Sequence, residues 1–127
     1  MRTIQSIEEL NIPPKYQSYL LKYLQNIADI PFISRVILFG SCAKESVTKY
    51  SDIDIFVTVN REISEEEEFS ISCDSLPEYS EYPLSSDILV QPESTFNKYK
   101  DTTCMIQKQV NYYGVDLSGL IPQCPRN

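Results

Sequence analysis

Two aspartates separated by one residue, Asp52 and Asp54, are the side chains of this chain best placed for chemistry. They begin the segment DIDIFVTV, whose alternation of side chains predicts a β-strand. Side chains at positions i and i+2 of a strand point to the same side, so both carboxylates face one way. Neighbouring carboxylates repel each other unless a cation lies between them, and aspartate oxygens with substrate phosphates are usual ligands of Mg²⁺. The pair therefore predicts a metal site.

A glycine–serine pair, Gly40-Ser41, stands ten residues before Asp52 and offers a different kind of group. It follows the apolar segment 33–39, which predicts a buried strand, and precedes a short helical segment at 42–47. Glycine lets the backbone approach a phosphate closely, and the start of a helix leaves free amide donors. We therefore interpret the pair as a phosphate-binding turn, a role compatible with Ser41 also capping the helix.

The elements that carry these residues can bring them together in only one arrangement. Gly40-Ser41 ends one strand and Asp52 begins the next, so they meet only if the two strands are antiparallel. Ten intervening residues are also too few for a parallel crossover. Asp87 begins a third strand, SDILVQ, and joins the other acids only if that strand runs parallel to the second. The connection 60–85 is long enough for this, so we expect the three carboxylates to converge.

The remaining segments predict helices around this sheet. Apolar residues recur at helical spacing over 13–30, a run of glutamates opens a helix over 64–76, and helical sequence covers 92–113 with a break near 101–102. The tail 118–127 contains two prolines and is expected to be loose. The prediction is an α/β (α+β) fold: a mixed sheet of about three strands flanked by helices. It forms a single domain over 1–127, with its core at about 13–117.

Composition excludes several classes of function. The net charge of −7 argues against general binding of nucleic acid. The chain has no histidine, which removes Ser-His-Asp and Cys-His catalysis, and its four cysteines form no CxxC pair, which argues against zinc. No segment approaches the length of a membrane span, and residues 1–10 lack an apolar signal core. We therefore expect a cytoplasmic protein with free thiols and no membrane partner.

The segment LFGSCAKESVTKYSDIDIFV resembles the polymerase-β-like nucleotidyltransferases, in particular the minimal nucleotidyltransferase group. Their signature is Gly-Ser, ten residues, then Asp-x-Asp, and this chain matches it without a gap. Asp87 stands where the family has a third carboxylate. The resemblance covers roughly residues 13 to 117. Glycine, serine, spacing, strand context and third acid agree, which makes the signal much more specific than an Asp-x-Asp alone.

The resemblance implies a chemistry for the acids. Asp52, Asp54 and Asp87 would be the catalytic residues and the metal ligands, holding two Mg²⁺ ions, with Mn²⁺ as the alternative. Asp87 would also help to deprotonate the attacking hydroxyl. A nucleoside monophosphate would pass from a nucleoside triphosphate, expected to be ATP, to an acceptor hydroxyl as pyrophosphate leaves.

The resemblance also implies roles beside the acids. Gly40 and Ser41 would hold the triphosphate, and Lys44 matches a basic position that contacts phosphate. One residue departs from the pattern, because the family commonly has glycine where this chain has Glu45. An extra acid beside the phosphate turn would weaken nucleotide binding unless it points to solvent.

Three functions remain open at this level. Members of the minimal group often act as antitoxins of two-protein toxin–antitoxin systems and modify a partner protein of the HEPN kind. Other relatives modify small molecules, including antibiotics. The third alternative is a module that binds a nucleotide or a partner protein without turnover.

Overall fold

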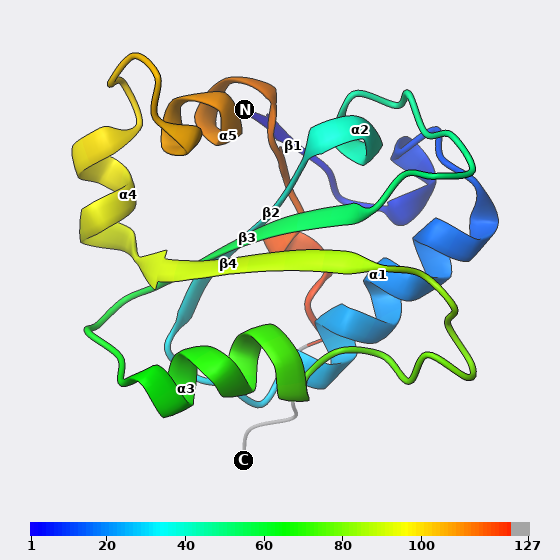
Figure 1. Ribbon diagram of the computed structural model, residues 1–127, viewed down its shortest axis with the longest axis horizontal. Coiled ribbons are helices and arrows are strands. Elements are labelled where there is room, and N and C mark those ends of the chain that lie inside the picture. Colours follow the sequence, from blue (N-terminus) through cyan, green and yellow to red (C-terminus); the bar gives the residue numbers. More distant parts are fainter. Residues whose placement is uncertain (123–127) are drawn as a thin grey trace.

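The central feature of the computed structural model, which describes residues 1–122, is a five-stranded mixed sheet with helices on both faces (Figure 1). In spatial order the strands are β1 (Arg2–Thr3), β5 (Val115–Asp116), β2 (Ile33–Phe39), β3 (Ile53–Val59) and β4 (Ser86–Pro92). β2 is antiparallel to β3 and to β5, whereas β3 and β4 are parallel, as are β1 and β5. The predicted antiparallel pair β2–β3 and parallel pair β3–β4 are therefore confirmed.

The sheet has two strands more than the roughly three expected from the sequence. β1 and β5 have two residues each, and they pair with one another at the edge beyond β2. A two-residue strand has no alternation to detect, so its existence depends on the partner that tertiary structure brings to it. Residues 1–12, which precede the predicted core range, also contribute buried side chains, namely Ile4, Ile7, Leu10 and Ile12.

One face of the sheet is covered by α1 (Pro14–Ile27), with α3 (Glu65–Phe69) and the following π-helical turn η2 (Ser70–Asp74) beside it. The helical spacing seen in the sequence is confirmed, since α1 buries three tyrosines, two leucines and Ile27. The helix ends at Ile27, three residues before the expected end at residue 30. Pro31 accounts for the difference, because a residue before proline is driven away from the helical conformation.

The other face is covered by α4 (Glu93–Tyr99) and α5 (Ile106–Tyr113), which lie above the sheet in Figure 1. The predicted break in this helical sequence is confirmed and spans 100–105. Under the two helices lies a small cluster of Ile37, Phe56, Phe96 and Val110, with the rings of Phe56 and Phe96 5.4 Å apart. Odd-numbered residues of β3 therefore face α1, and even-numbered residues face α4 and α5.

Three short elements complete the described chain: η1 (Ile7–Glu9) before α1, α2 (Gly40–Ala43) after β2, and η3 (Ser118–Leu120) after β5. The hydroxyl of Ser118 accepts the N–H of Val36 at 3.0 Å, so the first part of the segment expected to be loose contacts β2. The rest of that segment, residues 123–127, lies outside the described residues. Within residues 1–122, no helix combines the length and apolar character needed to cross a bilayer.

Candidate active site

The glycine–serine turn lies directly against one of the predicted acids. Gly40 opens α2 (Gly40–Ala43) immediately after β2, and its φ of +72° lies in the left-handed region that glycine adopts without strain. Its neighbour across the β2–β3 pair is Asp54, which is the register partner of Phe39. A Cβ on residue 40 would overlap Oδ2 of Asp54. Glycine is thus required both by the backbone angle and by the nearby carboxylate.

The parallel pairing of β3 and β4 places Asp87 beside Asp54. The two residues are register partners, so their side chains lie on the same face of the sheet. Asp52 precedes β3 by one residue and is exposed, as is Asp87, whereas Asp54 is half-buried. Burial raises the pKa of Asp54, and the negative charges of Asp87 and Asp52 raise it further. The negative charges of Asp52 and Asp87 therefore both act on the carboxylate of Asp54, which lies between Gly40 and Asp87.

The acids form an all-oxygen donor set with uncompensated charge, which fits a hard divalent cation. Within residues 1–122, however, no three Asp, Glu, Cys or His side chains are grouped as a ready-made metal site. The expected convergence of all three carboxylates is thus not present as a preformed cluster. Like charges repel, so bringing the three carboxylates together costs free energy that only a cation between them would offset. The backbone register sets their proximity, and a cation would have to draw the side chains together.

Two tyrosines of α1 donate hydrogen bonds to the residues just before two of the acids. The hydroxyl of Tyr16 donates to the carbonyl of Ser51 at 3.0 Å, and that of Tyr19 donates to the hydroxyl of Ser86 at 2.7 Å. Each bonded serine immediately precedes an acid, Asp52 or Asp87. In the sequence these tyrosines indicate only a buried helix face. The available signal is that a buried tyrosine hydroxyl needs a partner.

Cys42 lies beside the acids but is not suited to nucleophilic chemistry. Its side chain is fully buried, and its Sγ donates to the carbonyl of Asp52 at 3.7 Å. Burial, followed by the charges of Asp54 and Asp52, raises the pKa of this thiol to about 11. The thiol is therefore protonated near neutral pH and supports the turn by packing. Cys42, Cys73 and Cys104 are free thiols, whereas Cys124 lies outside the described residues.

Lys44, the predicted phosphate contact, directly follows α2, and its side chain reaches toward α5. Its Nζ lies 4.6 Å from the centroid of the Tyr113 ring, a cation–π geometry. Tyr113 is the last residue of α5 and stacks edge-on against Tyr112 at 4.7 Å. Sequence reasoning did not single out Tyr113 as a partner of Lys44, because the two are distant in the chain. The contact brings the end of α5 next to the glycine–serine turn.

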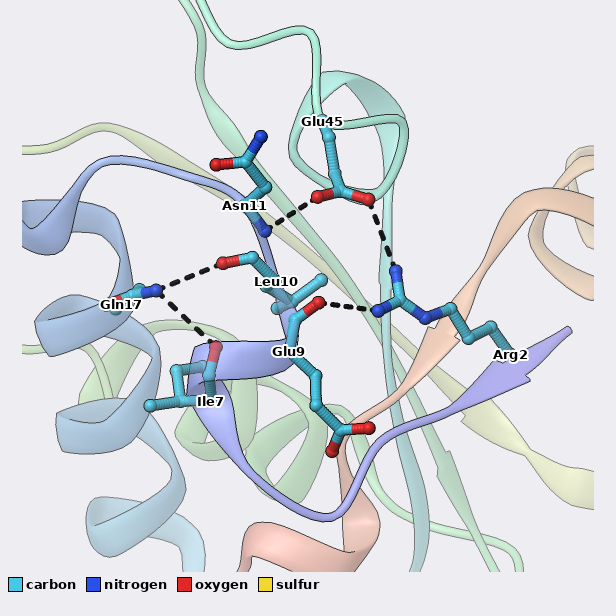
Figure 2. A network of polar contacts seen from close by, with 7 residues as sticks. All are labelled: Arg2, Ile7, Glu9, Leu10, Asn11, Gln17 and Glu45. Carbon is cyan, nitrogen blue, oxygen red and sulfur yellow. Dashed lines mark hydrogen bonds and ion pairs between the residues drawn. The ribbon is translucent and has the colours of Figure 1, made fainter.

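Glu45, the departure from the family pattern, has its charge paired. Figure 2 shows its carboxylate between the N-terminal residues Arg2 and Asn11. It accepts the backbone N–H of Asn11 at 2.6 Å and lies 3.3 Å from Nη1 of Arg2. The two expected possibilities were a carboxylate near bound phosphate or one in open solvent. The structure shows a third, in which the acid is held by the N-terminal segment.

A nucleotidyltransferase domain family matches residues 18–115, and the chain belongs to this family. The match spans the glycine–serine turn and all three acids. The chain is accordingly a nucleotidyltransferase, as the resemblance in the sequence implied. No curated protein matches the chain.

The solved structures support the same fold. The chain is similar to a crystal structure described as that of a toxin–antitoxin MntA–HpeT mutant, with a TM-score of 0.51 and 21% sequence identity. The similarity covers 80% of this chain and 70% of that one. At this level of identity the likeness concerns the fold alone. The predicted polymerase-β-like nucleotidyltransferase fold is confirmed, with five strands in the sheet.

Proposed function

We propose that this chain transfers a nucleoside monophosphate from Mg²⁺-bound ATP to a hydroxyl group of a partner protein. One observation carries the proposal: the strand register places Asp54 against Gly40 on one side and beside Asp87 on the other. A phosphate-binding turn and a carboxylate pair at the same end of one sheet are the parts that phosphoryl chemistry needs.

Each acid has a role that matches its surroundings. Asp52, Asp54 and Asp87 would hold two Mg²⁺ ions, with Mn²⁺ as a substitute, and the bound metal would stabilise negative charge on the triphosphate. The exposed carboxylate of Asp87 is open to an incoming acceptor and would take the proton of the attacking hydroxyl. The hydroxyl oxygen then bonds to the α-phosphorus, the α–β anhydride bond breaks, and pyrophosphate leaves.

The turn and its lysine would position the triphosphate. The main-chain N–H groups of Gly40 and Ser41 are suited to donate to phosphate oxygens, because glycine leaves the backbone uncovered. The ammonium group of Lys44 would neutralise part of the phosphate charge while its stem stays near Tyr113. We infer a cytoplasmic setting, where ATP and Mg²⁺ are available and thiols stay reduced.

The acceptor is proposed on the strength of the fold. The similar solved structure is described as a toxin–antitoxin MntA–HpeT mutant, a description that pairs two components. We propose a HEPN-type protein as that partner. A small-molecule acceptor and a nucleotide-binding module without turnover are the competing functions, and the transfer experiment separates them.

The test incubates the purified chain with Mg²⁺, each of the four nucleoside triphosphates labelled at the α-phosphate, and the proteins encoded beside its gene. We expect label to appear on one partner protein. Asp54→Asn and Asp87→Asn should each lower the rate by about 10²- to 10³-fold, the usual loss when one stabilising group is removed. Asp101→Asn, which changes an exposed acid in the loop between α4 and α5, is the matched control and should transfer normally.

Other outcomes point to the other functions. Label on a small molecule alone would favour the antibiotic-type enzyme. Magnesium-dependent binding of nucleotide without transfer would favour the binding module. If metal and nucleotide together fail to raise the melting temperature, the proposed site is wrong, because a ligand of the native state must stabilise it.

A further inference from the structure

Glu45 closes the phosphate turn in a backbone conformation that favours glycine. Its φ is +56°, in the left-handed region. The turn it closes is tight: the N–H of Lys44 donates to the carbonyl of Gly40 at 3.2 Å, and the N–H of Ser46 donates to that of Ser41 at 2.9 Å. A glutamate in this conformation is strained, so other contacts of the residue must stabilise the conformation.

Those contacts come from residues near the N-terminus. The carboxylate of Glu45 accepts the N–H of Asn11, 34 residues away, at 2.6 Å, and pairs with Arg2, 43 residues away, at 3.3 Å. Arg2 also donates through Nη2 to the carbonyl of Glu9 at 2.5 Å. Figure 2 shows the resulting chain of contacts from Glu45 through Arg2 to Glu9. One carboxylate therefore connects the turn to two points of the N-terminal segment (residues 1–12).

The N-terminal segment is itself held firmly enough to support the turn. β1 pairs with β5, and the side chain of Leu10 is 1% exposed. The side-chain amide of Gln17 on α1 donates to the carbonyl of Leu10 at 3.0 Å (Figure 2). Contacts with β5 and with α1 thus anchor the segment from two sides. A carboxylate tied to this segment is tied to the body of the domain.

We propose that Glu45 is a positioning residue, through which Arg2 and Asn11 hold the Gly40–Ser41 turn in the geometry that receives the nucleoside triphosphate. The nucleotide-binding role in this inference rests on the proposed function. The contacts of Glu45 with Arg2 and Asn11 do not depend on it. Glycine would adopt this left-handed conformation without strain. Glutamate adopts it with the support of its contacts to Arg2 and Asn11, which we call the tether. The N-terminal segment thereby supports the nucleotide site through Glu45, without contacting the nucleotide itself.

Three variants test the tether. Glu45→Gly relieves the left-handed backbone but removes both contacts. Glu45→Gln keeps an acceptor for the N–H of Asn11 and removes the ion pair. Arg2→Ala removes the ion pair from the other partner. Arg61→Ala is the matched control, because the Arg61–Glu67 pair has side-chain exposures of 50% and 34%, close to the 45% and 32% of Arg2 and Glu45.

The first readout is amide hydrogen exchange over residues 40–46, which needs no nucleotide. Exchange there should speed up by about tenfold in Glu45→Gly and by a smaller factor in Glu45→Gln and Arg2→Ala, since opening of a local unit sets the rate. Arg61→Ala should leave it unchanged. Unchanged exchange in Glu45→Gly would overturn the inference, whatever the fate of the proposed function.

The second readout is the kinetics of transfer. Glu45→Gly should raise the KM for the nucleotide by about 5- to 20-fold and change kcat by less than about twofold, because a loosened turn mainly weakens binding. Glu45→Gln should lie between that variant and the wild type. A purely structural role predicts no split between KM and kcat, and an unaltered KM in Glu45→Gly would contradict positioning. A wild-type chain without any transfer or nucleotide binding would instead overturn the proposed function, while hydrogen exchange still decides on the tether.

Discussion

The face of the sheet under α1 buries a continuous apolar core, whereas the face under α4 and α5 carries a four-residue cluster beside the acids. The two faces also treat polar groups differently. On the α1 side the hydroxyls of Tyr16, Tyr19 and Tyr23 all have hydrogen-bond partners. On the other side, the hydroxyl of Thr58 and the side-chain oxygen of Gln107 are buried without a partner in the described part of the chain.

The comparison teaches how one small sheet serves two purposes. Satisfied hydroxyls and a large core make the α1 face the source of stability, and they fix the strand starts from which the acids project. The opposite face contains features that are unfavourable for folding stability: like charges side by side, unpartnered polar atoms and only a small apolar cluster. Costs of this kind gather where a protein binds or transforms a ligand. Four predictions test this division.

The largest effect is expected from equivalent cavities on the two faces. Ile55→Ala on the α1 face and Ile37→Ala on the other face each remove a fully buried strand isoleucine. Both should lower the free energy of unfolding within the usual range of about 2 to 5 kcal/mol, with Ile55→Ala near the upper end because its larger core cannot collapse into the cavity. Urea unfolding measures both. Equal losses would mean that the faces contribute alike.

The second prediction separates positioning from stability within α1. Tyr16→Phe, Tyr19→Phe and Tyr23→Phe each delete one hydrogen-bonded hydroxyl and should each cost about 1 kcal/mol of stability. Only the first two hydroxyls hold residues next to an acid, so only those variants should lose metal-dependent transfer, by about 3- to 10-fold.

Tyr23→Phe is the built-in control, since its hydroxyl donates at 3.1 Å to the carbonyl of Ile71, in the turn after α3. Thermal melts and transfer rates of the three variants provide the comparison. Equal transfer in all three would show that α1 stabilises the fold without placing the acids.

The third prediction concerns the unpartnered hydroxyl of Thr58. Thr58→Val keeps the shape of the side chain and removes a buried oxygen without a hydrogen bond. Replacing such a group by a methyl should be neutral or raise stability by up to about 1 kcal/mol. Differential scanning calorimetry measures the change. A clear loss of stability would indicate that a bound water satisfies this hydroxyl.

The smallest effect is a pH-dependent gain from Asp54→Asn. The pKa of Asp54 is raised above its ordinary value of 3.8, so the folded state binds the proton more tightly than the unfolded chain. Stability attributable to this group therefore falls as pH rises through the raised pKa, and the full penalty is present above it. Asp54→Asn should raise Tm at neutral pH by about 1 to 3 °C, because partial exposure screens the repulsion.

The gain should disappear when melts are repeated near about pH 3, where the carboxyl is protonated in both states. Added Mg²⁺ should stabilise the wild type and not the variant. A lower Tm for Asp54→Asn at neutral pH would mean that the carboxylate makes favourable contacts that outweigh its repulsion.

The sequence was sufficient to predict most of the strands that carry the site and how they pair. The strand 33–39 has the expected bounds, and the strand pairing followed from the ten-residue spacing and the need to bring the acids together. These inferences work because side-chain periodicity and loop length are local properties. The same reasoning could not detect β1 or β5, since two residues show no period and pair only through contacts distant in sequence.

The sequence by itself determined the family, the glycine–serine pair and the spacing of the acids, because motif spacing and strand alternation are written in consecutive residues. Only tertiary structure decided what surrounds them. It brought the hydroxyls of Tyr16 and Tyr19 to the residues before two acids and placed Arg2 against Glu45. The physical reason is that hydrogen bonds and ion pairs form between groups near in space, and folding alone sets which distant groups become neighbours.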